Sequence, residues 1–148
     1  MQFCSRASLF RNIAKTFPME KEYTEELMLD FGTDGNALVP VVTQDYNSGK
    51  VLILAYANRD AYKETIESGY ATFYSRSRKE IWKKGLTSEN LLKVIEIRIN
   101  CEQNSLLFMV TREGPGACHA LKPDGTPQET CFYRRIIPGD KLEIVAVD

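Results

Sequence analysis

The sequence has no strong excess of positive or of negative charge. Its 148 residues include 19 Lys or Arg and 20 Asp or Glu, which gives a formal net charge of -1 at pH 7. The chain therefore lacks the overall basic field that attracts nucleic acid. It also has no apolar run that approaches the length of a membrane helix. This length and composition predict one globular domain with a buried core.

Cysteine and histidine are scarce as well. There are four cysteines and a single histidine, His119. Because no secretory signal accompanies the cysteines, we expect a reducing, cytoplasmic environment and no disulfide framework. The pattern assigns no role to Cys4, the first of the four.

Acidic residues are absent from positions 1–18, which do carry basic residues. This composition is typical of an organelle transit peptide, and several apolar residues could form one face of a helix. They are Phe3, Leu9, Phe10, Ile13 and Phe17. A docked helical extension or a true start at Met19 would also explain the pattern, and we favour these explanations over import into an organelle. We therefore predict an extension or targeting segment over 1–18 and one domain over 19–148.

Short segments of alternating apolar and polar residues fill most of the remaining chain. They predict an α+β domain with a mostly antiparallel, barrel-like sheet and two or three helices. Helices are expected over 20–30 and 59–68. Strands are expected over 38–43, 50–56, 70–74, 92–99, 106–111 and 130–136.

Single residues sharpen these expectations. Asn58 can cap the second helix, and Gly69 can end it in a left-handed conformation. Pro40 is expected to place the first strand near a sheet edge, because proline cannot donate to a ladder. Leu27 is expected to be buried, and the isoleucines of 95–99 are expected to share one face.

Three cysteines stand at the ends of these predicted elements. Cys101 ends a strongly patterned strand segment, whereas Cys118 and Cys131 bracket a turn-rich loop. Three thiolates could hold one zinc ion and leave a position open for water, as in catalytic zinc sites. Three unrelated core cysteines fit the same spacing, because free cysteine is often buried. Spacing alone favours this second interpretation.

A basic loop follows the third expected strand. It places the guanidinium groups of Arg76 and Arg78 beside the hydroxyls of Ser75 and Ser77, a combination suited to phosphate. Further candidates follow along the chain: Trp82, Lys84, Thr87 and Ser88. A charged surface loop would look the same, and so would a single-stranded nucleic-acid site. The lone aromatic residue and the slightly acidic chain disfavour nucleic acid.

Three blocks of residues stand in a characteristic order. The first contains Gln44-Asp45-x-x-Ser48-Gly49 and continues to Asn58. The second joins the Ser75–Arg78 loop to Trp82-x-Lys84-Gly85-x-Thr87-Ser88. The third comprises Gly114-Pro-Gly-Ala-Cys-His119 and Cys131-Phe-Tyr-Arg134. In order and spacing, these blocks resemble the phosphoribosyl-AMP cyclohydrolases of histidine biosynthesis over residues 36–135.

The resemblance implies an activity and a metal site. Members of the family hydrolyse the N1–C6 bond of the adenine ring in phosphoribosyl-AMP. They are intertwined homodimers whose zinc is held by three cysteines from both subunits, which correspond to Cys101, Cys118 and Cys131. Zinc makes water nucleophilic near neutral pH. His119 would either transfer protons in this reaction or orient the metal site, and both roles stay open.

The same resemblance implies where the substrate binds. The corresponding residues are Asp45, Ser75, Arg76, Ser77, Arg78, Trp82, Lys84, Thr87 and Ser88.

The sequence departs from the family pattern near this site. The family's Asp-Cys-Asp-x-Asp segment, whose aspartates bind magnesium, here reads Asn100-Cys101-Glu102-Gln103-Asn104. One glutamate and two amides should hold Mg²⁺ more weakly, because this hard cation prefers carboxylates and water. The loop after Cys118 is also longer than in the family, and Glu89 replaces a glycine.

Two functions are therefore compatible with the sequence. One is a working cyclohydrolase with a weakened magnesium site. The other is an impaired or substrate-shifted member that binds a related nucleotide. Retention of the three cysteines and of the Ser75–Arg78 loop favours the working enzyme.

Overall fold

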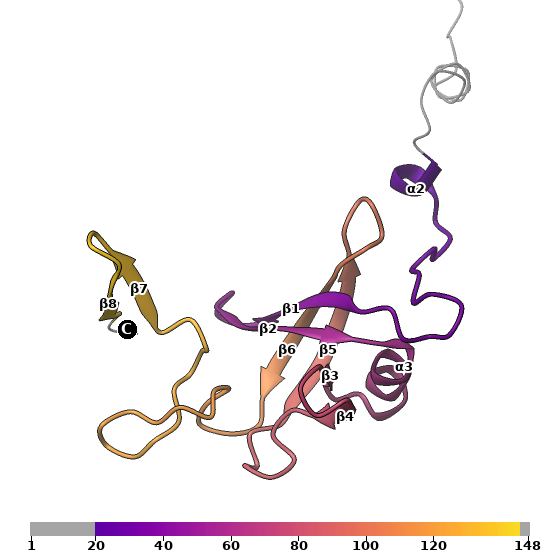
Figure 1. Ribbon diagram of the computed structural model, residues 1–148. Helices are drawn as coiled ribbons and strands as arrows, with labels where there is room; N and C mark the ends of the chain where they lie inside the picture. Colours follow the sequence, from indigo (N-terminus) through magenta and orange to yellow (C-terminus); the bar gives the residue numbers. More distant parts are fainter. Residues whose placement is uncertain (1–19, 146–148) are drawn as a thin grey trace, which may run out of the picture.

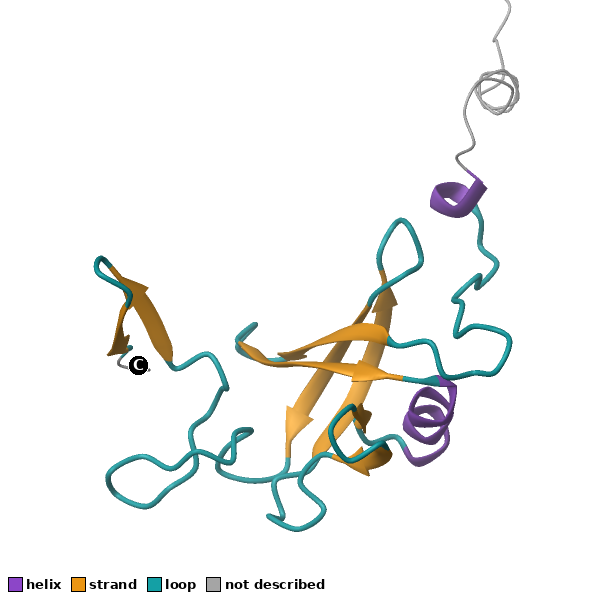
Figure 2. Cartoon of the chain, viewed as in Figure 1, coloured by secondary structure: helices purple, strands orange, loops and turns teal. Residues whose placement is uncertain are grey.

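The computed structural model describes residues 20–145, so the helix expected within 1–18 and Cys4 lie outside the described part. Figure 1 shows the order of the elements in space, and Figure 2 shows that strands and loops predominate over helix. The helices are α2 (Glu20–Tyr23) and α3 (Arg59–Ser68). The strands are β1 (Val39–Asp45), β2 (Val51–Ala57), β3 (Thr72–Ser75), β4 (Glu80–Lys83), β5 (Leu92–Ile99), β6 (Leu106–Arg112), β7 (Arg134–Ile137) and β8 (Lys141–Ile144).

The main sheet has four strands in the order β2-β1-β6-β5, and two further pairs, β3-β4 and β7-β8, stand outside it. All pairs are antiparallel except β1 with β6, which run parallel. The α+β class and the mostly antiparallel pairing are confirmed. The barrel-like closure is wrong, because β2 and β5 form the two open edges of this sheet. The alternation of apolar and polar residues predicts that one face of the sheet is buried, but it does not say what buries it. Here α3 and the β3-β4 pair cover that face, and no strand closes the sheet into a barrel within the described residues.

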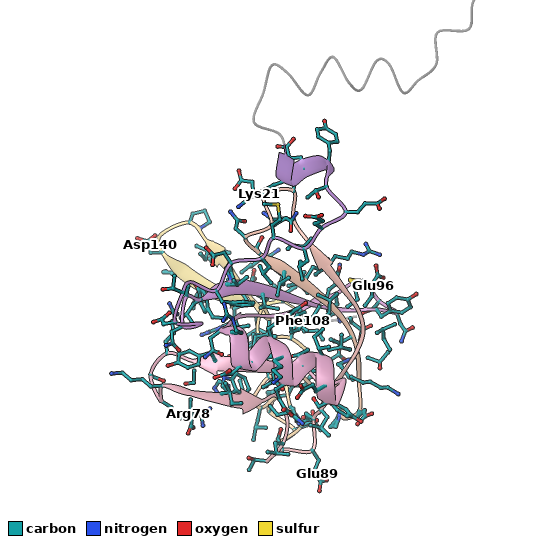
Figure 3. The ribbon with its side chains drawn as sticks, turned by 90° about the vertical axis from the view of Figure 1, so that its right-hand side faces the viewer. Lys21, Arg78, Glu89, Glu96, Phe108 and Asp140 are labelled. Carbon is teal, nitrogen blue, oxygen red and sulfur yellow. The ribbon has the colours of Figure 1, made fainter. Side chains whose placement is uncertain are left out.

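The core lies between the sheet and these covering elements. Phe73 of β3 and Phe108 of β6 are fully buried and their rings stack, with centroids 6.0 Å apart. In Figure 3, Phe108 lies in the interior and Arg78 at the outer edge of the molecule. Neither helix within residues 20–145 is long and apolar enough to cross a membrane.

Helix α3 forms where the sequence predicts it. The Asn58 side chain accepts a hydrogen bond from the Ala61 amide, and Gly69 ends the helix at φ 74°. These caps satisfy backbone groups that a helix leaves unpaired at its two ends.

Other local expectations are wrong for identifiable reasons. The first helix ends at Tyr23, because the Thr24 hydroxyl accepts a hydrogen bond from the Glu26 amide in a competing turn. Leu27 beyond it is 60% exposed. A β-bulge between Val94 and Glu96 shifts the alternation, so that Ile95 points to solvent.

Proline 40 lies in a central strand and not near an edge. Pro40 pairs with Tyr56 on the β2 side, and the ladder to β6 begins only at Val41. The sheet therefore accommodates proline at the start of β1, before the second partner strand is engaged.

The last expected strand is displaced along the chain. Instead of 130–136, strand β7 begins at Arg134, and β8 follows it in a hairpin. Ahead of β7, the Thr130 hydroxyl and the Cys131 amide donate hydrogen bonds to the carbonyls of Val51 and Leu52. Figure 1 shows the hairpin apart from the main sheet, joined to it by this long loop.

Candidate active site

Cys118 and Cys131 lie near each other, at the two ends of the loop that joins them. Cys118 is buried and Cys131 is half-buried, and the two thiols lie near enough to influence each other electrostatically. Burial, followed by the neighbouring Cys118, raises the pKa of the Cys131 thiol to about 11, while the positive charge of Lys84 acts in the opposite direction. A metal cation at this pair would reverse the effect of burial, because coordination deprotonates thiols.

The backbone fixes the positions of both cysteines. The amides of Ala117 and Cys118 both donate to the carbonyl of Gln128, at 3.1 Å. Gly116 makes this close approach feasible, since a Cβ atom there would lie 2.6 Å from the same carbonyl oxygen. The Cys131 amide donates to Leu52 of β2 at 2.8 Å. Cys118 is therefore held against the segment that leads to Cys131, and Cys131 is held against β2 of the main sheet.

Cys101 lies at the opposite end of the sheet. It is exposed, in the turn between β5 and β6, whereas Cys118 comes after the far end of β6 (Figure 1). Strand β6 has 7 residues and so separates the two ends by roughly 20 Å. Within residues 20–145 of one chain, no three Cys, His, Asp or Glu side chains are placed to hold a metal ion.

The basic loop is assembled within a single chain. Ser75 ends β3, and its hydroxyl accepts hydrogen bonds from the backbone amide and Nε of Arg78, at 3.3 and 3.4 Å. Arg78 also pairs with Glu80 at 3.4 Å. The Arg76 guanidinium lies 4.3 Å from the centre of the Tyr56 ring, a cation–π geometry that holds it over β2. Ser77 is exposed beside Ser75, with their hydroxyls 3.4 Å apart.

Trp82 connects this loop to the cysteine pair. Its ring packs against Phe73, and two cations lie near the ring centre: the Arg78 guanidinium at 6.0 Å and the Lys84 ammonium at 5.8 Å. Lys84 is only 8% exposed and also lies near Cys131. A buried positive charge between the basic loop and the thiols favours anionic groups in both places.

The remaining predicted residues of this region lie on the surface. His119 is exposed directly after the buried Cys118. Thr87 and Ser88 are exposed in the turn after β4. Gly85 precedes them at φ 84°, where a Cβ atom would collide with the backbone of Asn90 at 2.0 Å. No larger residue fits at this position of the turn.

Asp45 already has several hydrogen-bonding partners in its own loop. Its Oδ1 accepts from the amides of Asn47 and Ser48 and from the Ser48 hydroxyl, at 3.1, 2.8 and 2.9 Å. Its Oδ2 lies 3.4 Å from the Arg112 guanidinium. Burial alone would raise the pKa of Asp45, but the Ser48 hydrogen bonds, followed by Arg112, outweigh it and lower the pKa. This carboxylate holds the β1-β2 loop in shape.

An ion-pair network missed by the sequence analysis extends from Asp45 to the cysteine loop. Arg112 lies 3.9 Å from Glu129, and Glu129 pairs with Lys50 at 2.8 Å. The members are far apart in the sequence, so no local pattern indicates the network. It links the end of β6, the β1-β2 loop and the segment just before Cys131.

The turn at Asn100–Ser105, where the resemblance implies a weakened magnesium site, is internally hydrogen-bonded. Asn100 Oδ1 accepts from the amides of Asn104 and Ser105, each at 2.9 Å. Asn104 Oδ1 accepts from Asn100 Nδ2 at 2.7 Å, and Glu102 Oε2 accepts from Asn104 Nδ2 at 2.8 Å. Most oxygens available for a cation are thus engaged, and only one carboxylate is present. The turn fits Mg²⁺ poorly.

Most of this chain is similar in sequence to known proteins. The family model described as phosphoribosyl-AMP cyclohydrolase matches residues 53–133. A relative named phosphoribosyl-AMP cyclohydrolase from Desulfatibacillum aliphaticivorans is 44% identical over 79% of this chain and 87% of its own length. Another with this name, from Archaeoglobus fulgidus, is 47% identical over 74% of this chain and 94% of its own.

A third relative is longer. The histidine biosynthesis bifunctional protein HisIE of Aquifex aeolicus is 49% identical over 79% of this chain, which spans only 53% of that protein. Residues 53–133, which the family model matches, contain the basic loop and the Cys118–Cys131 pair. Because the family model covers more than half of the residues and single-domain relatives align over most of their length, the chain belongs to the phosphoribosyl-AMP cyclohydrolase family, a family of hydrolases.

Proposed function

We propose that this protein is a phosphoribosyl-AMP cyclohydrolase, which opens the adenine ring by hydrolysis of the N1–C6 bond in histidine biosynthesis. The observation that carries the proposal is the Cys118–Cys131 pair, which lies beside the buried Lys84 next to the basic loop. Lys84 lies near the thiol pair and also near Trp82, against which the basic loop's Arg78 lies. We infer that the thiols, which can bind a metal, and the loop, which can bind phosphate, serve one nucleotide.

A zinc ion fits the thiol pair. Cys118 and Cys131 supply two soft ligands near each other, and Lys84 nearby favours the anionic form of Cys131. We propose that the partner subunit's Cys101 completes the set, since the chain's own Cys101 is at the far end of the sheet. When bound, zinc supplies Lewis-acid chemistry that makes water nucleophilic near neutral pH.

The chain's own side chains would perform the remaining steps. Arg76 and Arg78 bind the substrate phosphates, with Trp82, Lys84, Thr87 and Ser88 in support. Water adds to C6, which is electrophilic because N1 is alkylated and the ring is cationic. As the N1–C6 bond breaks and C6 becomes a carboxamide, water gives up both protons: one goes to N1, and the other stays on the amidine of the product, which keeps the positive charge. We propose that His119, which is exposed and directly follows Cys118, moves the proton that goes to N1.

A cytoplasmic homodimer is part of the proposal. The β7-β8 hairpin has no substantial contact with another helix or strand of residues 20–145, and its apolar side chains face solvent. Ile136 is 80% exposed, Leu142 55% and Ile144 66%. A second copy that covers this hairpin would bury the apolar surface and bring a Cys101 to the thiol pair.

Mixing two inactive variants tests the shared site. Cys101→Ala and Cys118→Ala are each expected to lose ring-opening activity on phosphoribosyl-AMP. After unfolding, mixing and refolding, the heterodimer contains one intact site, because one subunit supplies Cys118 and Cys131 and the other supplies Cys101. Random pairing then restores roughly a quarter of the parental activity. Absence of recovery, with dimers of both variants formed, would contradict a site shared between subunits.

The second candidate function rests on the hydrogen-bonded turn at Asn100–Asn104. Since that turn fits Mg²⁺ poorly, the chain could be an impaired or substrate-shifted member that binds a related nucleotide. Parental protein that retains zinc and binds nucleotide, but does not open the ring with or without added Mg²⁺, would favour this candidate.

A further inference from the structure

Gln103 is the buried member of an otherwise exposed turn. Its neighbours Cys101, Glu102 and Asn104 are exposed, whereas Gln103 is 6% exposed. Its amide group makes three hydrogen bonds to backbone far away in the sequence. Oε1 accepts from the Met28 amide at 2.6 Å, and Nε2 donates to the carbonyls of Lys21 and Glu26, each at 3.2 Å.

These hydrogen bonds give the turn a second connection to the domain, besides the strands β5 and β6 that it joins. The other side-chain hydrogen bonds of the turn that were described above all end within residues 100–105. The segment bound by Gln103 continues through Leu29, which packs on the core, to Phe31, which is 5% exposed. A continuous path of contacts therefore runs from the core through this segment to Gln103 and the turn.

The backbone of Gln103 adopts a conformation that glutamine rarely has. Its φ is 54°, a left-handed value that favours glycine or asparagine. The turn would therefore accept glycine at this position with less strain. A glutamine placed here is explained by what its side chain binds and not by the needs of the turn.

We propose that Gln103 is a positioning residue for the metal site. Its buried amide clamps the segment from Lys21 to Met28 against the turn and so fixes how Cys101 is presented to the partner subunit. This inference rests on the proposed function, in which Cys101 serves the zinc of the other subunit. The N-terminal segment thereby becomes a support of an active site to which it contributes no ligand.

Gln103→Gly tests the clamp, since it keeps the left-handed backbone and removes only the side chain. The full-length dimer is loaded with Co²⁺, whose thiolate charge-transfer absorption rises with the number of bound thiolates. We expect the band of Gln103→Gly to fall to the level of Cys101→Ser, although Cys101 is still present. Zinc retention against a chelator should weaken by about tenfold or more, as for other residues that orient metal ligands.

A matched control is Lys79→Gly, at another exposed turn where φ is 56°. It should leave the cobalt spectrum as in the parent. A parental spectrum and parental zinc retention in Gln103→Gly would overturn the inference and leave the ligand set intact. If Cys101→Ser itself has the parental spectrum, the ligand set is wrong and the inference fails with it.

Gln103→Glu gives a second measurement should the glycine variant not fold. Glutamate keeps the acceptor for Met28 but cannot donate to the carbonyls of Lys21 and Glu26. The same loss of the cobalt band is expected in a folded dimer. A parental band would overturn the inference.

Discussion

A single chain brings the residues of the basic loop together, but it does not bring the three cysteines together. The hydroxyl of Ser75 and both arginines lie within one turn and its flanking strands, held by hydrogen bonds of 3.3–3.4 Å and by the Tyr56 ring. The cysteines instead occupy the two ends of the main sheet. A phosphate site built from consecutive residues can form in each subunit, whereas the proposed zinc site needs two subunits.

Because of this difference, variants of the basic loop and variants of the cysteines should lose activity for different reasons. Damage to the basic loop should weaken nucleotide binding and leave metal and dimer intact. Damage to a cysteine should remove metal from a site to which both subunits contribute. The variants below are ordered from the largest expected effect to the smallest.

Cys118→Ala should abolish tight zinc binding, because it removes one thiol of the Cys118–Cys131 pair. Metal analysis of the purified, dialysed dimer measures this loss. Cys4→Ala is the control for a change in cysteine number. Zinc content equal to that of the parent in Cys118→Ala would contradict the assignment of this residue as a ligand.

Arg76→Ala should weaken binding of adenosine phosphates by about tenfold or more, the cost of losing one charge-assisted hydrogen bond. Calorimetric titration with nucleotide measures it, while zinc content should not change. Lys79→Gly removes a neighbouring charge at φ 56°, where glycine is tolerated, and should have a smaller effect. Equal affinities for parent and Arg76→Ala would show that this arginine is only part of a charged surface.

Asp45→Asn should lower the free energy of unfolding by about 1 kcal/mol at neutral pH, because the amide cannot match the charged hydrogen bonds and the Arg112 pair. In the folded protein, the pKa of Asp45 lies below its ordinary value of 3.8. The ionised carboxylate therefore stabilises the fold fully at pH values above 3.8. This stabilisation is lost as the pH falls through the lower, folded pKa. Urea unfolding at several pH values should show parent and variant converging in acid. A constant difference down to the most acidic conditions would contradict this account.

The smallest effect is expected from restoring the acids of the altered turn. Asn100→Asp, Glu102→Asp and Asn104→Asp together raise the local negative charge from about one to about three, which increases attraction to Mg²⁺. We expect Mg²⁺ to bind the triple variant severalfold more tightly, at some cost in the hydrogen bonds of the turn. Isothermal titration with Mg²⁺ measures the change, and activity should rise with it if the ion serves the reaction. High parental activity that is unaffected by the three changes would show that the turn has no part in turnover.

The sequence predicts those features whose causes are local. The ends of α3 follow from Asn58 and Gly69, each of which acts within its own turn. The bulge that exposes Ile95 and the central position of β1 depend on which strands pair, and no short pattern specifies pairing. The open sheet was missed for the same reason.

The candidate site shows the same limit. The basic loop and its hydroxyls are visible as consecutive residues. The distance between Cys101 and the other two cysteines depends on the length of β6 and the direction of its neighbours. The clamp by Gln103 joins residues that are 75 to 82 positions apart, so only a folded structure reveals it.

The parallel pairing of β1 with β6 has a consequence for how the chain folds. Val41 lies beside Leu106, and Asp45 beside Val110. On the ribosome, β1 and β2 emerge early and can form their hairpin, but β1 must wait for β6 before its second edge is covered. Closing such a long loop costs entropy before any contact repays it. We therefore expect the β1-β2 hairpin to form first and the complete sheet to appear late, when β6 and the cysteine-bearing segment that follows it become available.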